Sequence, residues 1–196
     1  MIYCILRPIG TILCKILFQV KAKGLEHLPK EGKVILAANH SSYLDSVVLG
    51  VVIPRRIKWI VRKDIYHLWW LKWLFVLTKM IPENGAIERS LFSLRDGEIL
   101  GIFPEGTRSR DGLLHSGKEG IGILALKSAA PVIPCAILGA FEAYPPHASF
   151  PKPHPIKIII GRPIIFETVE MPDEAMTTSA VETIMSAIRS LMEERA

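Results

Sequence analysis

The chain has 196 residues, 49% of them hydrophobic, which is enough for one domain with a buried core. Its formal charge is +5, from 24 Lys and Arg against 19 Asp and Glu, and its mean hydropathy is +0.31. A basic chain this apolar favours a membrane over a nucleic acid as its partner. Cys4, Cys14 and Cys135 are odd in number, lie far apart and form no C-x-x-C pair, so neither a disulfide framework nor a zinc knuckle is indicated, which fits a reducing cytoplasm.

The first twenty residues are mostly apolar but contain the cations Arg7 and Lys15. A spanning helix needs ~20 apolar residues with few charges, and the small-residue cleavage site of a signal peptide is not seen. Residues 1–20 are therefore predicted to associate with the membrane surface, with the two cations reaching the headgroups. The alternative is a helix packed on the core. Residues 21–196 are expected to form the main domain.

Apolar runs and turn residues along the chain predict strands that alternate with helices. Strands are predicted at 33–38, 55–62, 98–103, 132–138, 156–160 and 164–166. Helices are predicted at 43–51, 65–80, 87–95, 117–129 and 172–194, and a proline-rich loop at 144–155. This alternation indicates a single α/β domain with a mostly parallel sheet flanked by helices.

The predicted helix at 65–80 is rich in tryptophan. Trp69, Trp70 and Trp73 lie beside the cation Lys72. Tryptophan next to cations is typical of a membrane interface, whereas a large apolar helix also suits a protein core. Both interpretations stay open.

The string from Asn39 to Asp45 directly follows the first predicted strand. On one ideal helix His40 and Asp45 would lie roughly 140° apart, so they meet only if His40 precedes the helix and Asp45 is in its first turn. The carboxylate then holds one imidazole nitrogen and leaves the other free as a base. Because no G-x-S-x-G nucleophile is present, this His–Asp pair is predicted to activate a substrate hydroxyl.

Asp45 has a second interpretation. Ser42-x-x-Asp45 matches a capping box, in which the carboxylate satisfies backbone N–H groups at the start of a helix. A metal site would need further ligands, and no HExxH motif, cysteine pair or acidic cluster supplies them. The capping role stays open beside the catalytic one.

The string 103–110 follows another predicted strand and contains Glu105, Gly106, Thr107 and Arg108. Gly106 lets backbone N–H groups approach an anion closely, Thr107 adds a hydroxyl, and the planar guanidinium of Arg108 suits phosphate or carboxylate. A phosphate-binding turn is predicted. The alternative is a solvated basic turn in which Glu105 pairs with an arginine.

Four blocks in this order resemble the glycerolipid acyltransferase family, and within it the bacterial 1-acyl-glycerol-3-phosphate acyltransferases: 24–29, 38–45, 103–110 and 130–134. The resemblance implies that His40 is the general base and Asp45 orients it. It also implies substrate binding by Glu105, Gly106, Thr107, Arg108 and Pro134. One block departs: the arginine usual before the third block is absent at the simplest alignment, and Arg89 is the candidate to replace it.

The resemblance implies transfer of a fatty-acyl group from an acyl thioester, either acyl-CoA or acyl carrier protein, to 1-acyl-glycerol 3-phosphate. The product would be phosphatidic acid for phospholipid synthesis, made at the cytoplasmic side of the cell membrane in contact with membrane phospholipid, with no bound cofactor, metal or nucleic acid. Residues 21–196 would be the acyltransferase domain. The alternatives are another acceptor (glycerol 3-phosphate or a lysophospholipid), a CoA-independent transacylase, and a non-catalytic lipid-binding protein on the same fold.

Overall fold

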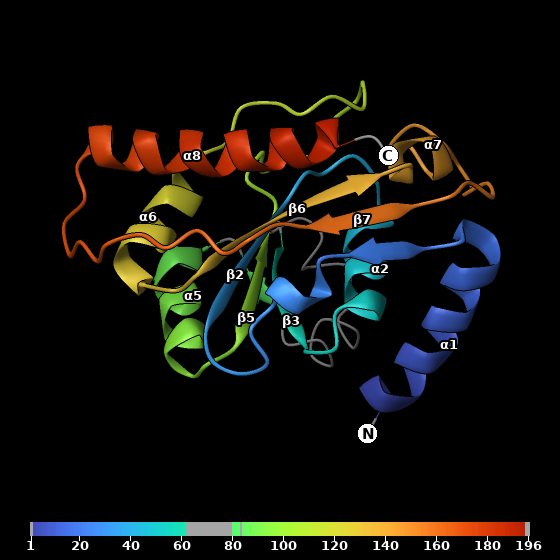
Figure 1. The fold of residues 1–196 in the computed structure, drawn as a ribbon, viewed down its shortest axis with the longest axis horizontal. Helices are drawn as coiled ribbons and strands as arrows, with labels where there is room; N and C mark the ends of the chain where they lie inside the picture. The colour runs from blue at the N-terminus through green and yellow to red at the C-terminus, as the bar shows by residue number, and fades with distance from the viewer. Residues whose placement is uncertain (1, 62–79, 83, 195–196) are drawn as a thin grey trace.

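A seven-stranded sheet with the order β1-β7-β6-β2-β5-β3-β4 runs through the molecule (Figure 1). The computed structural model describes residues 2–61, 80–82 and 84–194. Every neighbouring pair of strands is parallel except β6 and β7. The strands are β1 (Lys21–Lys23), β2 (Val34–Ala38), β3 (Ile57–Val61), β4 (Ile81–Pro82), β5 (Ile99–Ile102), β6 (Val132–Leu138) and β7 (Lys157–Ile160).

Helices cover both faces of this sheet, as Figure 1 shows. One face carries α1 (Ile2–Phe18) and α2 (Asp45–Val52), and the other carries α5 (Ala86–Arg95), α6 (Glu119–Ser128) and α8 (Glu174–Glu193). Two short helical pieces, η1 (Leu25–His27) and α7 (Ala140–Ala143), lie in connections. The prediction of a single α/β domain with a mostly parallel, helix-flanked sheet is confirmed.

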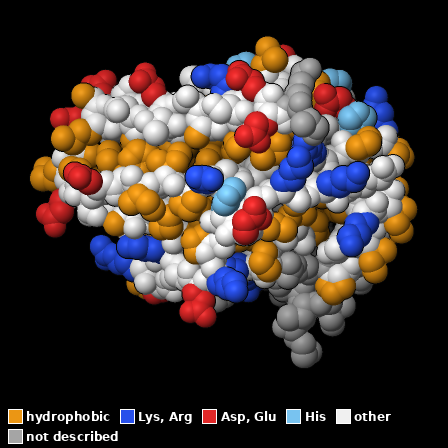
Figure 2. All heavy atoms as spheres, in the orientation of Figure 1, with side chains coloured by type: hydrophobic (Ala, Val, Ile, Leu, Met, Phe, Trp, Pro, Cys, Tyr) orange, Lys and Arg blue, Asp and Glu red, His pale blue; other side chains and the backbone are white. Residues whose placement is uncertain are grey.

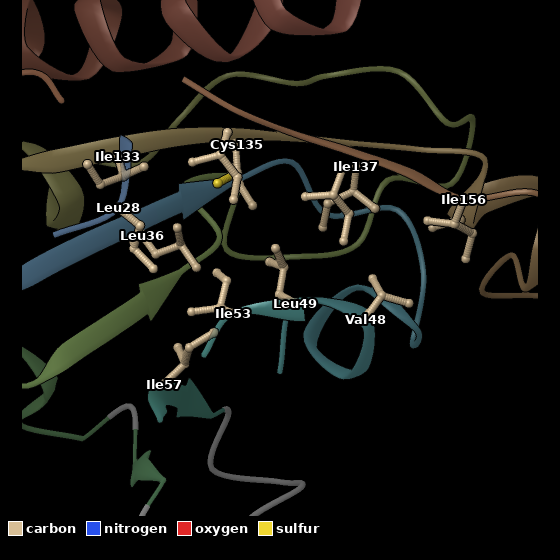
Figure 3. Close-up of a cluster of buried hydrophobic side chains, with 14 of the residues drawn as sticks. Leu28, Leu36, Val48, Leu49, Ile53, Ile57, Ile133, Cys135, Ile137 and Ile156 are labelled. Atoms are coloured by element: carbon tan, nitrogen blue, oxygen red, sulfur yellow. The ribbon is translucent and has the colours of Figure 1, made fainter. Parts of the chain in front are cut away.

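The central strand β2 explains why the core has two halves. All five of its residues are buried, as expected for a parallel strand covered on both faces. Successive side chains alternate: Leu36 packs with α2 and β6 residues in one cluster, shown in Figure 3, and Ile35 packs with α6 and α8 residues in the other. The buried strand therefore holds its carboxyl end in a fixed place.

The helix α1 has one buried and one exposed side. Cys14 and Phe18 belong to the core, while Ile12 and Ile16 are 59% and 70% exposed. Within residues 2–61, 80–82 and 84–194, no helix has the length and apolar character needed to cross a membrane. The helix therefore packs on the core and also presents apolar side chains outward.

Most predicted elements agree with the structure to within about two residues, and β6 matches its prediction in full. The helix predicted from residue 43 begins at Asp45, because a turn occupies residues 42–44. The segment predicted as a strand at 164–166 makes a single bridge, between Ile164 and Val132. The predicted tryptophan-rich helix lies outside the described residues except for its last position.

Candidate active site

The two sequence strings lie at one edge of the sheet because β2 and β5 are parallel neighbours. Their loops are bonded directly to each other. The backbone N–H of Ser109 donates to the carbonyl oxygen of His40 at 2.7 Å. The backbone N–H of His40 donates to Oε1 of Glu105 at 2.8 Å. The loop that carries the histidine is therefore held by the loop that carries Arg108.

His40 and Asp45 form a close pair. Nδ1 of His40 lies 2.8 Å from Oδ2 of Asp45, and the two side chains are 19% and 0% exposed. His40 lies before α2 and Asp45 is the first residue of this helix, which is the arrangement that their spacing requires. With Nδ1 donating to the carboxylate, Nε2 is the ring nitrogen left to accept a proton.

The same carboxylate oxygen also orders the start of α2. Oδ2 of Asp45 accepts hydrogen bonds from the backbone N–H groups of Ser41 and Ser42, each at 2.8 Å. The hydroxyl of Ser42 accepts from the N–H of Leu44 and donates to the carbonyl oxygen of Tyr144. The capping and the histidine-orienting interpretations of Asp45 thus describe one arrangement.

Aromatic rings hold the face of the His40 imidazole. The ring stacks on Phe103 with centroids 3.9 Å apart, and Phe103 stacks on Trp59 at 4.8 Å. Gly101 makes room for this, because a Cβ there would lie 2.6 Å from atoms of the Trp59 ring. Nothing local in the sequence indicates this stack, so no role was predicted for Phe103 or Gly101.

Asn39 ties the histidine loop to β6. Its side-chain amide donates to the carbonyl oxygen of Ile137 at 3.0 Å and accepts from the Ile137 N–H at 2.7 Å. Asn39 is 3% exposed. Asn39 was not predicted as a site residue, although a polar residue directly after an apolar strand is a usable signal.

Glu105 is buried and bonded to two backbone N–H groups. Oε1 accepts from His40, and Oε2 accepts from His115 at 3.1 Å. Burial raises the pKa of Glu105, and these two hydrogen bonds oppose that rise. No arginine among the described residues forms an ion pair with it. Its carboxylate supports the two loops.

The turn at 106–108 leaves several donors of Thr107 and Arg108 unused among the described residues. Gly106 has φ +68° and donates its N–H to Phe103. Within the described part of the chain, the backbone N–H groups of Thr107 and Arg108 donate to no protein atom. The guanidinium of Arg108 lies 3.6 Å from the ring centroid of Tyr43, and its Nη1 is buried with no partner among those residues. These donors are suited to an anion.

Two other expected residues, Pro134 and Arg89, make no hydrogen bond to the 105–108 turn among the described residues. Pro134 is inside β6, in register with Ala37, and its carbonyl oxygen accepts from the N–H of Gly161 at 2.8 Å. Arg89 is exposed on α5. No group of three potential metal ligands occurs among the residues that the structure describes. The pair at His40 and the donors at 106–108 are what the structure brings together.

The chain is similar in sequence to proteins of known name. The chain is 28% identical over 180 residues to a 1-acyl-sn-glycerol-3-phosphate acyltransferase of Bacillus subtilis, covering 88% of this chain and 87% of the relative. It is 27% identical over 157 residues to a chloroplast enzyme of the same name from Arabidopsis thaliana, covering 75% of this chain and 44% of that protein.

A solved structure has the same fold. The crystal structure of the 1-acyl-sn-glycerophosphate acyltransferase of Thermotoga maritima matches with a TM-score of 0.81 at 22% identity, covering 99% of this chain and 80% of that one. The model of the family described as Acyltransferase matches residues 19–138, which is more than half of the chain. The protein therefore belongs to the acyltransferase family and is an acyltransferase enzyme.

Proposed function

We propose that the enzyme transfers a fatty-acyl group from an acyl thioester to the free hydroxyl of 1-acyl-glycerol 3-phosphate, making phosphatidic acid for phospholipid synthesis. The observation that carries this proposal is the bonding of His40 to the loop that holds Arg108. A proton acceptor and an anion site on one sheet edge suit a substrate that has both a hydroxyl and a phosphate. The names of the Bacillus and Arabidopsis relatives support this acceptor.

The proton transfer starts at His40. Its Nε2 takes the proton of the acceptor hydroxyl as the oxygen attacks the thioester carbonyl carbon, and Asp45 stabilises the imidazolium through Nδ1. The C–S bond then breaks, and the imidazolium returns the proton to the leaving thiolate, so a free thiol is released. A base of this kind contributes roughly 10²–10⁴-fold to the rate.

The acceptor phosphate binds at Thr107 and Arg108. The two unused backbone N–H groups, the Thr107 hydroxyl and the guanidinium supply its donors, and Gly106 gives the turn its left-handed backbone. A bound phosphate gives the buried Nη1 of Arg108 a hydrogen-bond acceptor. This favours binding, because a buried donor without a partner costs about 1–3 kcal/mol. Glu105 and Pro134 support the loops and the sheet.

Residues 1–20 bring the enzyme to the cytoplasmic side of the cell membrane, and residues 21–196 form the acyltransferase domain. Along α1 the exposed side chains Ile12 and Ile16 flank the cation Lys15. Figure 2 shows hydrophobic side chains beside Lys and Arg at the right-hand edge, where α1 lies in Figure 1. Such a surface binds anionic phospholipid through both apolar contact and charge. The acyl donor is acyl-CoA or acyl carrier protein.

The function is tested by an acceptor panel. Purified enzyme is given acyl-CoA or acyl carrier protein with lysophosphatidate, glycerol 3-phosphate or a lysophospholipid, and the release of free thiol is measured. We expect release with lysophosphatidate that falls to background in His40→Ala, which still binds lipid. Release without an acceptor, or a preference for another acceptor, would overturn the proposal.

Membrane association has its own test. Ile12→Ser combined with Ile16→Ser removes the exposed apolar side of α1 but leaves its buried residues in place. We expect this variant to melt like the wild type and to lose most sedimentation with vesicles containing phosphatidylglycerol. Unchanged sedimentation would contradict the proposed role of α1.

A further inference from the structure

Lys118 lies against the turn that we assign to the phosphate. A Cβ built on Gly106 would lie 2.7 Å from Cε of Lys118 and 2.8 Å from both Cδ and Nζ. The lysine side chain therefore occupies the space that any side chain at position 106 would need. The absence of a side chain at Gly106 lets the ammonium group reach the turn.

The backbone holds Lys118 in this place. Its N–H donates to the carbonyl oxygen of Pro104 at 2.8 Å, directly before the turn. Lys118 is also the extended residue that precedes the first turn of α6. The position of its Cα is thus set on one side by the turn and on the other by a helix packed in the core.

The charge of Lys118 has no carboxylate partner in the part of the chain that the structure describes. Among the described residues no carboxylate lies within ion-pair distance of its Nζ. The nearby carboxylate of Glu105 is engaged by two backbone N–H groups. A lysine that fills the space over a glycine without meeting a carboxylate is available to a ligand.

The Lys118 side chain reaches the same turn that carries Arg108. Gly106 and Arg108 are two residues apart, so their Cα atoms are separated by at most about 7 Å. The unused N–H groups of Thr107 and Arg108 lie along the same short segment. A phosphate monoester carries close to two negative charges at neutral pH because its second pKa is about 6, whereas a phosphodiester carries one.

We propose that Lys118 binds the acceptor phosphate as a second cation beside Arg108 and so selects a phosphomonoester over a phosphodiester acceptor. This inference rests on the proposed function, because it assumes that the 105–108 turn holds the acceptor. Two cations match the dianion, and a headgroup with a single phosphate charge leaves one of them without a counter-charge.

The test replaces Lys118 in three ways. Lys118→Met keeps most of the side-chain volume and removes the charge, Lys118→Gln removes the charge with a shorter stem, and Lys118→Arg keeps the charge. Lys127→Met is the matched control, because Lys127 is an exposed lysine at the other end of α6. KM and kcat for lysophosphatidate are measured, together with calorimetric titration of glycerol 3-phosphate and glycerophosphocholine.

We expect Lys118→Met and Lys118→Gln to raise KM roughly tenfold with little change in kcat, as for loss of a hydrogen bond to a charged group. Lys118→Arg should recover most of the affinity, and Lys127→Met should match the wild type. The wild type should bind glycerol 3-phosphate more weakly as the pH falls below about 6, where the phosphate loses its second charge. In Lys118→Met the affinity for glycerol 3-phosphate should change less with pH.

Unchanged affinity in both Lys118→Met and Lys118→Gln, or a loss confined to kcat, would overturn the inference and leave the proposed function intact. If the wild type does not acylate lysophosphatidate, the proposed function fails. The titrations with glycerol 3-phosphate would still decide the role of Lys118. Melting temperatures of all variants identify any that fail to fold. If Lys118→Met does not fold, Lys118→Gln takes its place.

Discussion

The two halves of the site differ in how their polar groups are satisfied. Around His40, hydrogen bonds within the protein converge on two carboxylates: Oδ2 of Asp45 accepts three, and both oxygens of Glu105 accept from backbone N–H groups. One acceptor is left over in this half, because Oδ1 of Asp45 is buried without a partner among the described residues. At Thr107 and Arg108, backbone and guanidinium donors are without protein partners in the described chain. The difference separates groups that must be oriented before the reaction from groups that wait for a ligand.

Asp45→Asn is the strongest test of the half of the site around His40, whose groups are oriented before the reaction (the pre-oriented half). The neutral amide no longer stabilises the imidazolium, and its oxygen accepts the three hydrogen bonds that reach Oδ2 more weakly than a carboxylate does. We expect kcat to fall about 10²–10⁴-fold, the contribution of a general base, and the melting temperature to drop. Steady-state kinetics and thermal unfolding measure the two effects.

Asp173→Ala is the matched control for the capping role of Asp45. Asp173 caps α8 by accepting from the N–H of Met176 at 2.7 Å and has no described contact with the site. Its removal should cost about 1 kcal/mol of stability and leave kcat unchanged. If Asp45→Asn lost only as much activity as Asp173→Ala, Asp45 would be a helix cap alone.

Glu105→Gln tests whether Glu105 belongs to the pre-oriented half. A glutamine keeps one acceptor oxygen, but its amide nitrogen must face the N–H of either His40 or His115. Stability should fall by about 1–3 kcal/mol, and kcat should fall about tenfold or more because the His40 backbone shifts. KM for the acceptor should change little. A large rise in KM with normal kcat would instead make Glu105 a ligand contact.

The outline of this site could be predicted because its parts are local. Each string follows an apolar strand, and the angle between His40 and Asp45 on a helix already required the turn that the structure shows. Gly106 and Arg108 carry recognisable anion-binding chemistry within one turn. The sequence interval between these residues is short, so local geometry constrains them.

The supporting contacts could not be predicted because they join distant parts of the chain. Glu105 accepts from a backbone group 65 positions away, and Asn39 bonds to Ile137, 98 positions away. The stack of Trp59 on Phe103 depends on the missing side chain of Gly101, which is paired with Trp59 across β3 and β5. Residue type alone indicates none of these partners.

Phe103→Leu tests how much the stack contributes to orienting His40. Leucine fills similar space but cannot lie flat against the imidazole, whose centroid is 3.9 Å from that of Phe103. Aromatic contacts of this kind contribute about 0.5–1.5 kcal/mol, so kcat should fall about two- to tenfold. Phe103→Tyr keeps the ring and should retain activity. Equal losses in both variants would rule out stacking as the cause.

Tyr43→Leu tests the other half of the site, at Thr107 and Arg108, and should have the smallest effect. The Tyr43 ring lies under the guanidinium of Arg108 and contacts Tyr144, at a centroid distance of 5.4 Å. An exposed cation–π contact contributes about 0.5–1 kcal/mol, so its loss should raise KM for the acceptor about two- to fivefold without changing kcat. Tyr43→Phe keeps the ring face and should behave like the wild type. A fall in kcat with unchanged KM would instead place Tyr43 with the groups that orient His40, because Tyr43 lies between His40 and Asp45 in the chain.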